Sequence, residues 1–146
     1  MPASLFGRNS SNPAPVARVL EGMELFSDCA LVLVPPSDYE TSSHKTVAVC
    51  AYLFGACDAL GQMNRITERE TMDCFRSFLR NRFPSVDPSR LDQIVSFVID
   101  AKNADVLASF VNGGGQAIVE WSRGNSKSPL GLLNLLQTHN ASEEDE

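Results

Sequence analysis

The stretch TVAVCAYLFGACDAL, residues Thr46–Leu60, decides the fold because it is apolar or small at nearly every position. A helix that is apolar on all sides lies in the interior of a protein, so we expect this stretch to form a central helix. Ala51, Gly55 and Ala59 recur every four residues and form a column of small side chains. Such a column lets a neighbouring helix approach closely, which offsets the roughly 0.5–1 kcal/mol that a helical glycine costs relative to alanine.

The composition is that of a globular chain, since 43% of the 146 residues are hydrophobic and 21% are charged. The formal net charge is −6, and Glu143–Glu146 contribute four of the negative charges. Binding to nucleic acid depends on clustered lysine and arginine, so we predict no nucleic-acid partner. The apolar stretch has 15 residues, short of the roughly 20 that span a bilayer, so we also predict no membrane partner.

The four cysteines, Cys29, Cys50, Cys57 and Cys74, lie apart from one another in apolar or helix-like stretches. Free cysteine in such surroundings behaves as a small hydrophobic residue. The chain has no CxxC pair and only two histidines, so we predict no metal site and no cofactor. Unpaired thiols are typical of a reducing compartment, and we therefore predict a cytoplasmic protein.

Helix boundaries can be read from prolines and from capping residues. Thr67 and Glu70 fit a capping box, and Asp87-Pro88 fits an N-cap followed by a first-turn proline. Gly113–Gly115 interrupt the next apolar pattern and predict a flexible joint, after which Gln116–Trp121 resume as a short helix or strand. The predicted helices cover about residues 15–34, 43–64, 67–83, 87–102, 103–111 and 128–138.

These boundaries predict an all-α, single-domain bundle of five to six helices. The domain is expected over residues 15–138, between a flexible segment 1–14 and a disordered acidic tail 139–146. The alternative is an α+β fold, because Cys29–Val34 is rich in residues that favour strands.

Asp58 is the one carboxylate in the central stretch. A carboxylate among apolar neighbours is a candidate general acid or base, and a pocket with Tyr52 and Cys57 is one hypothesis. The favoured interpretation is a structural carboxylate near the helix end, because a lone acid does not make a site. We therefore assign no catalytic residue.

Two features indicate binding to another protein. The first is the LxxLL pattern of the last predicted helix, whose anchors could fill a groove on a partner, although packing on its own domain is the favoured interpretation. The second is the basic side of the third predicted helix, where Arg76 and Arg80 could face an acidic partner, although a solvated face is the favoured interpretation. The leucines concerned are Leu132, Leu133, Leu135 and Leu136.

The sequence thus favours a non-catalytic protein–protein interaction module over an enzyme. It would act on a protein partner or on a second copy of itself, as a dimer, or as an adaptor or regulatory protein. The alternative is a small-ligand-binding protein or an enzyme that uses a pocket around Asp58.

Overall fold

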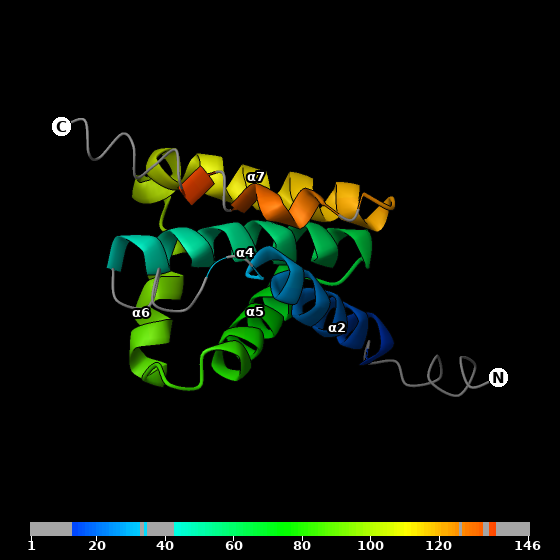
Figure 1. Ribbon diagram of the computed structural model, residues 1–146. Helices are drawn as coiled ribbons and strands as arrows, with labels where there is room; N and C mark the ends of the chain where they lie inside the picture. Colours follow the sequence, from blue (N-terminus) through cyan, green and yellow to red (C-terminus); the bar gives the residue numbers. More distant parts are fainter. Residues whose placement is uncertain (1–12, 33, 35–42, 126, 133–134, 137–146) are drawn as a thin grey trace.

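The computed structural model describes residues 13–32, 34, 43–125, 127–132 and 135–136. These residues form five α-helices and two short 3₁₀ helices, and none of them is in a strand. The all-α prediction is therefore confirmed for the described part of the chain. The elements are α2 (Pro13–Ala30), α4 (Ser43–Met63), α5 (Glu68–Arg82), α6 (Pro88–Ile99), η1 (Ala101–Asn103), α7 (Ala104–Ser122) and η2 (Ser128–Leu130) (Figure 1).

Two of the predicted segments lie mainly outside the described residues. The predicted segment 1–14 lies outside them except for its last two residues, which begin α2. The predicted tail 139–146 lies outside them entirely.

Helix α4 is the centre of the bundle, as the apolar stretch predicts. It contacts each of the other four α-helices, and its residues Val49–Leu53 have no exposed surface. Figure 1 shows α7 along one side of α4, with α5 and α6 on the other side. A helix surrounded in this way cannot be amphipathic, which explains why its sequence has no polar face.

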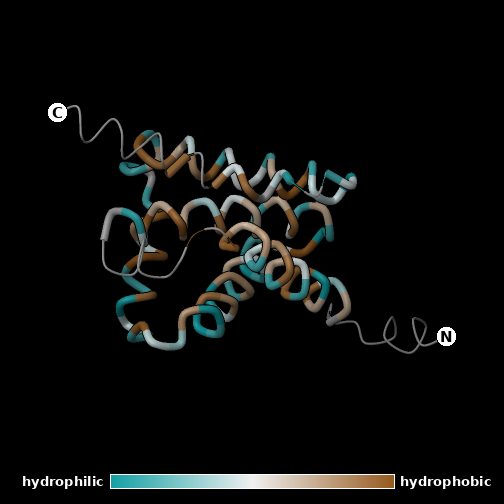
Figure 2. The backbone as a smooth tube through the Cα atoms, in the orientation of Figure 1, coloured by the Kyte–Doolittle hydropathy of each residue, from teal (hydrophilic) through white to brown (hydrophobic). Residues whose placement is uncertain are grey.

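The length and composition of α4 would also suit a membrane span, because Lys45–Met63 form a 19-residue apolar stretch. The structure buries most of this stretch inside the protein, including 61% of its apolar part. In Figure 2, α4 is pale to brown between hydrophilic ends, and other helices of the bundle cover it. This burial is consistent with a soluble protein.

Helices α4 and α7 run in the same direction and meet backbone to backbone (Figure 1). A Cβ atom added at Gly55 of α4 would overlap the carbonyl oxygen of Val111 on α7. A Cβ atom added at Gly114 of α7 would overlap the carbonyl oxygen of Tyr52 on α4. The close approach predicted for the column of small residues on α4 is therefore present at Gly55.

The predicted joint at Gly113–Gly115 is wrong, because these glycines lie inside the continuous helix α7. Glycine lowers helix stability by about 1 kcal/mol per residue relative to alanine, and this penalty suggested a break. The close contact with α4 overrides that preference, since no larger residue fits at Gly114. Residues Gln116–Trp121 belong to the same helix, which excludes a separate short helix or strand there.

The starts of α5 and α6 follow the sequence prediction. The Thr67 side chain accepts a hydrogen bond from the Glu70 amide at 3.0 Å, and Glu70 Oε1 accepts one from the Thr67 amide at 2.8 Å. Asp87 caps α6 by accepting from the Ser89 amide at 2.9 Å. The capping box and the N-cap of α6 are both confirmed.

The strand alternative at Cys29–Val34 is not supported. Cys29 and Ala30 end helix α2, and the next two residues form a turn. The Leu31 amide bonds back to the Ser27 carbonyl at 2.9 Å, so the backbone pairs locally. Leu31 and Val34 are nevertheless buried, which accounts for the apolar composition of this short segment.

The predicted fourth helix is shorter than expected, since α6 ends at Ile99. The Asp100 carboxylate accepts a hydrogen bond from the Lys102 amide at 3.0 Å, and η1 follows. This local turn ends the helix before Lys102, where the sequence suggested a helical last turn.

The predicted last helix begins as a 3₁₀ helix that is held against α7. The Ser128 hydroxyl donates a hydrogen bond to the Ala117 carbonyl oxygen at 2.8 Å. Residues 131–132 and 135–136 are helical, and the two residues between them lie outside the described part. Leu132 and Leu136 of this segment are buried in the core.

Candidate functional site

The three residues of the hypothetical pocket, Tyr52, Cys57 and Asp58, all lie on α4 but have different surroundings. Tyr52 is fully buried and stacks on Phe26 of α2, with ring centroids 6.0 Å apart. Cys57 is fully buried toward α5, and its Sγ lies 3.9 Å from the Thr71 carbonyl oxygen. Asp58 is only half-buried. Six residues of helix separate Tyr52 from Asp58, which turns their side chains to different sides of α4.

The Asp58 carboxylate has a partner on its own helix. Gln62 Nε2 donates a hydrogen bond to Asp58 Oδ2 at 3.1 Å, one turn further along α4. The pair lies at the exposed end of the helix, and no arginine in the described part of the chain forms an ion pair with Asp58. This arrangement supports a structural role for the carboxylate.

The buried thiols and phenol are poor acids. Burial raises the pKa of Cys50 to about 12. Burial also raises the pKa of Cys57, and the nearby Cys74 and Asp58 raise it further. Burial raises the pKa of the Tyr52 hydroxyl, although a backbone hydrogen bond with Leu132 opposes this shift. A thiol needs a lowered pKa to act as a nucleophile at neutral pH, so these groups are suited to packing.

The described residues contain no group of three or more histidine, cysteine, aspartate or glutamate side chains that could hold a metal ion. Cys74 is close enough to Cys57 to raise the pKa of the Cys57 thiol, after the larger effect of burial. Both cysteines are free and buried. Two protonated thiols do not form a metal site, because thiolates are the ligands.

The leucines predicted to bind a partner have different exposures. Leu132 is fully buried and Leu136 nearly so, whereas Leu135 is half-buried. Leu133 lies outside the described residues. Leu132 and Leu136 could reach a partner only if this segment left the core.

Tyr52 and Leu135, from two different sequence hypotheses, are brought together in the structure. They line one cleft of about 270 Å³ between α7 and the last helical segment. Gln116 and Glu120 of α7 supply its polar side. This cleft contains neither Cys57 nor Asp58.

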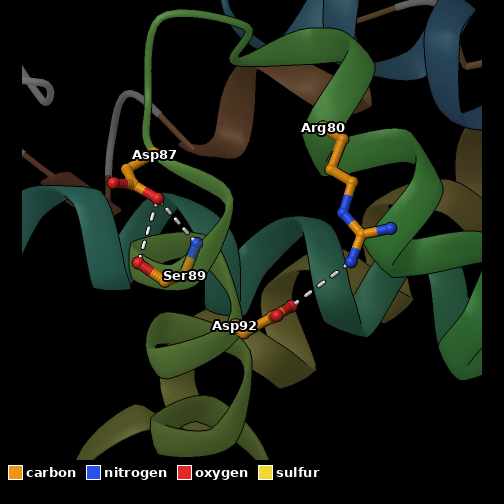
Figure 3. A network of polar contacts seen from close by, with 4 residues as sticks. All are labelled: Arg80, Asp87, Ser89 and Asp92. Carbon is orange, nitrogen blue, oxygen red and sulfur yellow. Dashed lines mark hydrogen bonds and ion pairs between the residues drawn. The ribbon is translucent and has the colours of Figure 1, made fainter.

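Arg76 and Arg80 lie on the face of α5 that points away from the core. Arg80 Nη2 lies 3.7 Å from Asp92 Oδ1 of α6, and both side chains are about half exposed (Figure 3). Figure 3 also shows Asp87 and Ser89 capping α6 close to this pair. Arg76 is half-buried and has no ion pair with any described residue.

An apolar groove lies between α4, α6 and α7 and was not predicted from the sequence. It has a volume of about 330 Å³, and residues far apart in the sequence form its walls. Asp100 and Asn112 are its polar residues. We call it the α6–α7 groove, and its lining is Phe54, Val98, Ile99, Asp100, Ala104, Leu107, Ala108, Val111 and Asn112.

Part of the groove lining is exposed to solvent. Ile99 retains 44% of its surface exposure, and Phe54 and Val111 are half-buried. One signal for the groove is present in the sequence, because Ala104, Ala108 and Val111 recur at helical spacing. That spacing indicates an apolar helix face, but it cannot show that the face is only partly covered.

Comparisons with known proteins add no assignment. No protein-family model matches the chain, and no curated protein or solved structure matches it.

Proposed function

We propose that this protein is a non-catalytic interaction module that binds another protein, or a second copy of itself, through the α6–α7 groove. The observation that carries the proposal is the half-exposed apolar lining of this groove, with Ile99 at 44% exposure beside Phe54. Exposed apolar surface that is continuous with a concave site is typical of a binding surface.

The shape of the groove supports a partner that presents a few apolar side chains. Its walls come from three helices, and its lining is apolar except for Asp100 and Asn112. An amphipathic helix can place side chains at i, i+3 and i+4 into such a depression. The polar residues would then fix the orientation of the partner, since hydrogen bonds to groove edges give specificity.

The other candidate, a small-molecule or catalytic site around Asp58, has less support. The cleft that Tyr52 lines contains neither Asp58 nor Cys57. Burial raises the pKa of Cys57 and of Tyr52, which disfavours both groups as nucleophiles or bases near neutral pH. We also propose a cytoplasmic location, because Cys29, Cys50, Cys57 and Cys74 are free thiols.

The test uses Ile99→Glu, which places a charge in the groove, and Leu25→Glu as the matched control. Leu25 is 59% exposed on α2 and does not line the groove. Size-exclusion chromatography with light scattering should show a concentration-dependent dimer for the wild type and for Leu25→Glu. Ile99→Glu should stay monomeric and keep its circular dichroism spectrum.

A monomeric wild type would exclude self-association and leave the adaptor form of the proposal. In that case a partner captured by the wild type and by Leu25→Glu should be lost with Ile99→Glu. The proposal fails if Ile99→Glu associates with itself, or with captured partners, as strongly as Leu25→Glu does.

A further inference from the structure

The basic residues of this acidic chain are concentrated on one helix. Five of its 12 lysines and arginines lie within residues 65–82, which cover α5 and the turn before it. The net charge of the whole chain is −6. The same residues contain Glu68, Glu70 and Asp73, so their net charge is +2, and an anionic segment would be attracted to α5.

Three of these arginines form a single outward surface, which we call the arginine face: Arg69, Arg76 and Arg80. At 3.6 residues per turn their side chains point within about 40° of one another. The opposite side of α5 is buried, with Cys74 and Phe78 among its core residues. The arginine face is therefore directed away from the protein.

The arginine face is only partly neutralised by neighbouring carboxylates. Asp73 lies on the same side of the helix, and Arg80 pairs with Asp92 at 3.7 Å. Neither Arg69 nor Arg76 forms an ion pair with a residue that the structure describes. Arg76 and Arg80 are one turn apart, so they repel each other unless an anion lies between them.

The chain carries one run of negative charge, Glu143-Glu144-Asp145-Glu146. It follows Leu136, which is 5% exposed and anchored in the core. Glu143 and Glu146 are seven and ten residues beyond Leu136, so an extended chain would carry them about 25 and 35 Å.

Figure 1 shows the last helical segment beside α7, while α5 lies on the other side of α4. Packed helices are separated by about 8–10 Å, so two spacings place the axis of α5 about 20 Å from the last helical segment. The outward face of α5 lies about one helix radius, roughly 5 Å, beyond that axis, so the straight-line distance is comparable with the reach of the acidic run. A tethered segment also has a high effective concentration, in the millimolar range.

We propose that Glu143–Glu146 bind the arginine face of α5 within the same chain. The carboxylates would pair with the guanidinium groups of Arg69, Arg76 and Arg80, and bidentate pairs are the preferred geometry. The tail would thus occupy the surface that an acidic partner would use. This proposal concerns a different surface from the α6–α7 groove and does not depend on it.

The test compares the wild type with a full-length variant that carries Glu143→Gln, Glu144→Gln, Asp145→Asn and Glu146→Gln. Two-dimensional ¹⁵N NMR spectra should differ at the tail and along residues 69–80, and not elsewhere. The differences along α5 should disappear in about 1 M NaCl, where the Debye length is about 3 Å.

Two pairs of substitutions separate the arginine face from general electrostatics. Arg76→Glu with Arg80→Glu should abolish the effect of tail neutralisation on α5. Arg123→Glu with Lys127→Glu changes the net charge equally at exposed positions elsewhere and should preserve that effect.

The proposal is overturned if neutralising the tail leaves the α5 signals in place or shifts another surface instead. It is also overturned if the effect survives Arg76→Glu with Arg80→Glu. A dependence on protein concentration would show binding between copies and contradict the intramolecular contact. None of these outcomes bears on the oligomeric state measured with Ile99→Glu.

Discussion

Helices α4 and α7 meet through glycines, whereas α5 and α6 are in contact through side chains, including a surface ion pair, and each begins at its own cap. At Gly55 and Gly114 the two backbones are so close that neither position has space for a Cβ atom. Between α5 and α6, the polar link is the exposed Arg80–Asp92 pair at 3.7 Å (Figure 3).

The difference determines how each pair responds to substitution. A backbone carbonyl that is blocked by a new side chain cannot rotate away, so the two helices must separate. An exposed side-chain pair can rearrange, and its loss costs about 0.2–1 kcal/mol. We therefore expect substitutions between α4 and α7 to lower the stability strongly, and substitutions at the polar ends of α5 and α6 to lower it only slightly.

The largest effect is expected for Gly55→Leu. The new side chain would collide with the Val111 backbone, which cannot rotate away, so the cost should reach or exceed the upper end of the usual range for overpacking, about 3 kcal/mol. Natural domains have only about 5–15 kcal/mol of stability, so a large unfolded fraction is expected. Urea unfolding followed by circular dichroism measures it.

The control for that variant is Gly113→Ala. Its Cβ atom would lie 2.8 Å from Cδ1 of Leu135, a side-chain end that can move. We expect a cost of about 1 kcal/mol or less. If both variants lost the same stability, contact with a backbone would cost no more than contact with a movable side chain, which would contradict the expectation.

Leu132→Ala should have the next largest effect, about 3 kcal/mol, because this fully buried side chain would leave a cavity. The half-buried Leu130 provides a matched control, and Leu130→Ala should cost less. A Leu132→Ala protein that is as stable as the wild type would show that the last segment does not belong to the core. Its leucines would then be free for a partner.

Thr67→Ala removes the N-cap of α5 and should cost about 1 kcal/mol. The reason is that the Glu70 amide would lose the acceptor that it now has at 3.0 Å. Thermal unfolding should show this loss, and Thr67→Ser should restore it. We expect Thr67→Ala to lose less stability than Leu132→Ala, and a larger loss for Thr67→Ala would contradict this expectation.

The smallest expected effect is the pH dependence of the stabilisation that Asp87 gives as the N-cap of α6. Hydrogen bonds from the Ser89 amide and hydroxyl lower the pKa of Asp87 below its usual value. The resulting stabilisation is complete above the unfolded-state pKa of about 3.9 and is lost as the pH falls through the lower folded-state pKa. Asp87→Asn keeps a capping side chain but does not titrate.

Urea midpoints at pH 6 and at pH 3 should therefore converge for the wild type and Asp87→Asn as the solution becomes acidic. The effect should be small, because Asp87 is exposed to solvent. An identical difference between the two proteins at both pH values would contradict the role of the ionised cap.

Local signals predicted much of the fold. The apolar stretch predicted α4, Thr67 with Glu70 predicted the start of α5, and Asp87-Pro88 predicted the start of α6. Each of these signals acts within a few residues, so a sequence displays it directly.

The errors arose where distant residues decide the structure. Gly113–Gly115 resemble a break in the sequence, and only the backbone of α4 explains why they continue a helix. The α6–α7 groove combines Phe54, Ile99 and Val111 from three helices, so no single stretch of sequence encodes it. A pocket shared by Tyr52 and Asp58 would require both side chains to lie on one side of α4, but helix geometry turns them to different sides.

The most direct test of the central claim compares Gly114→Ala with Gly115→Ala. The two positions are adjacent in α7, so the gain of about 1 kcal/mol in helix propensity is the same for both. At Gly114 the added Cβ atom would overlap the Tyr52 carbonyl oxygen, whereas at Gly115 it would lie 3.4 Å from the Gly55 carbonyl oxygen.

The free energy of unfolding in urea should fall by about 2 kcal/mol or more for Gly114→Ala. For Gly115→Ala it should stay within about 1 kcal/mol of the wild type. Equal stability of the two variants, or a stabilised Gly114→Ala, would contradict the claim that direct backbone contact between α4 and α7 organises this fold.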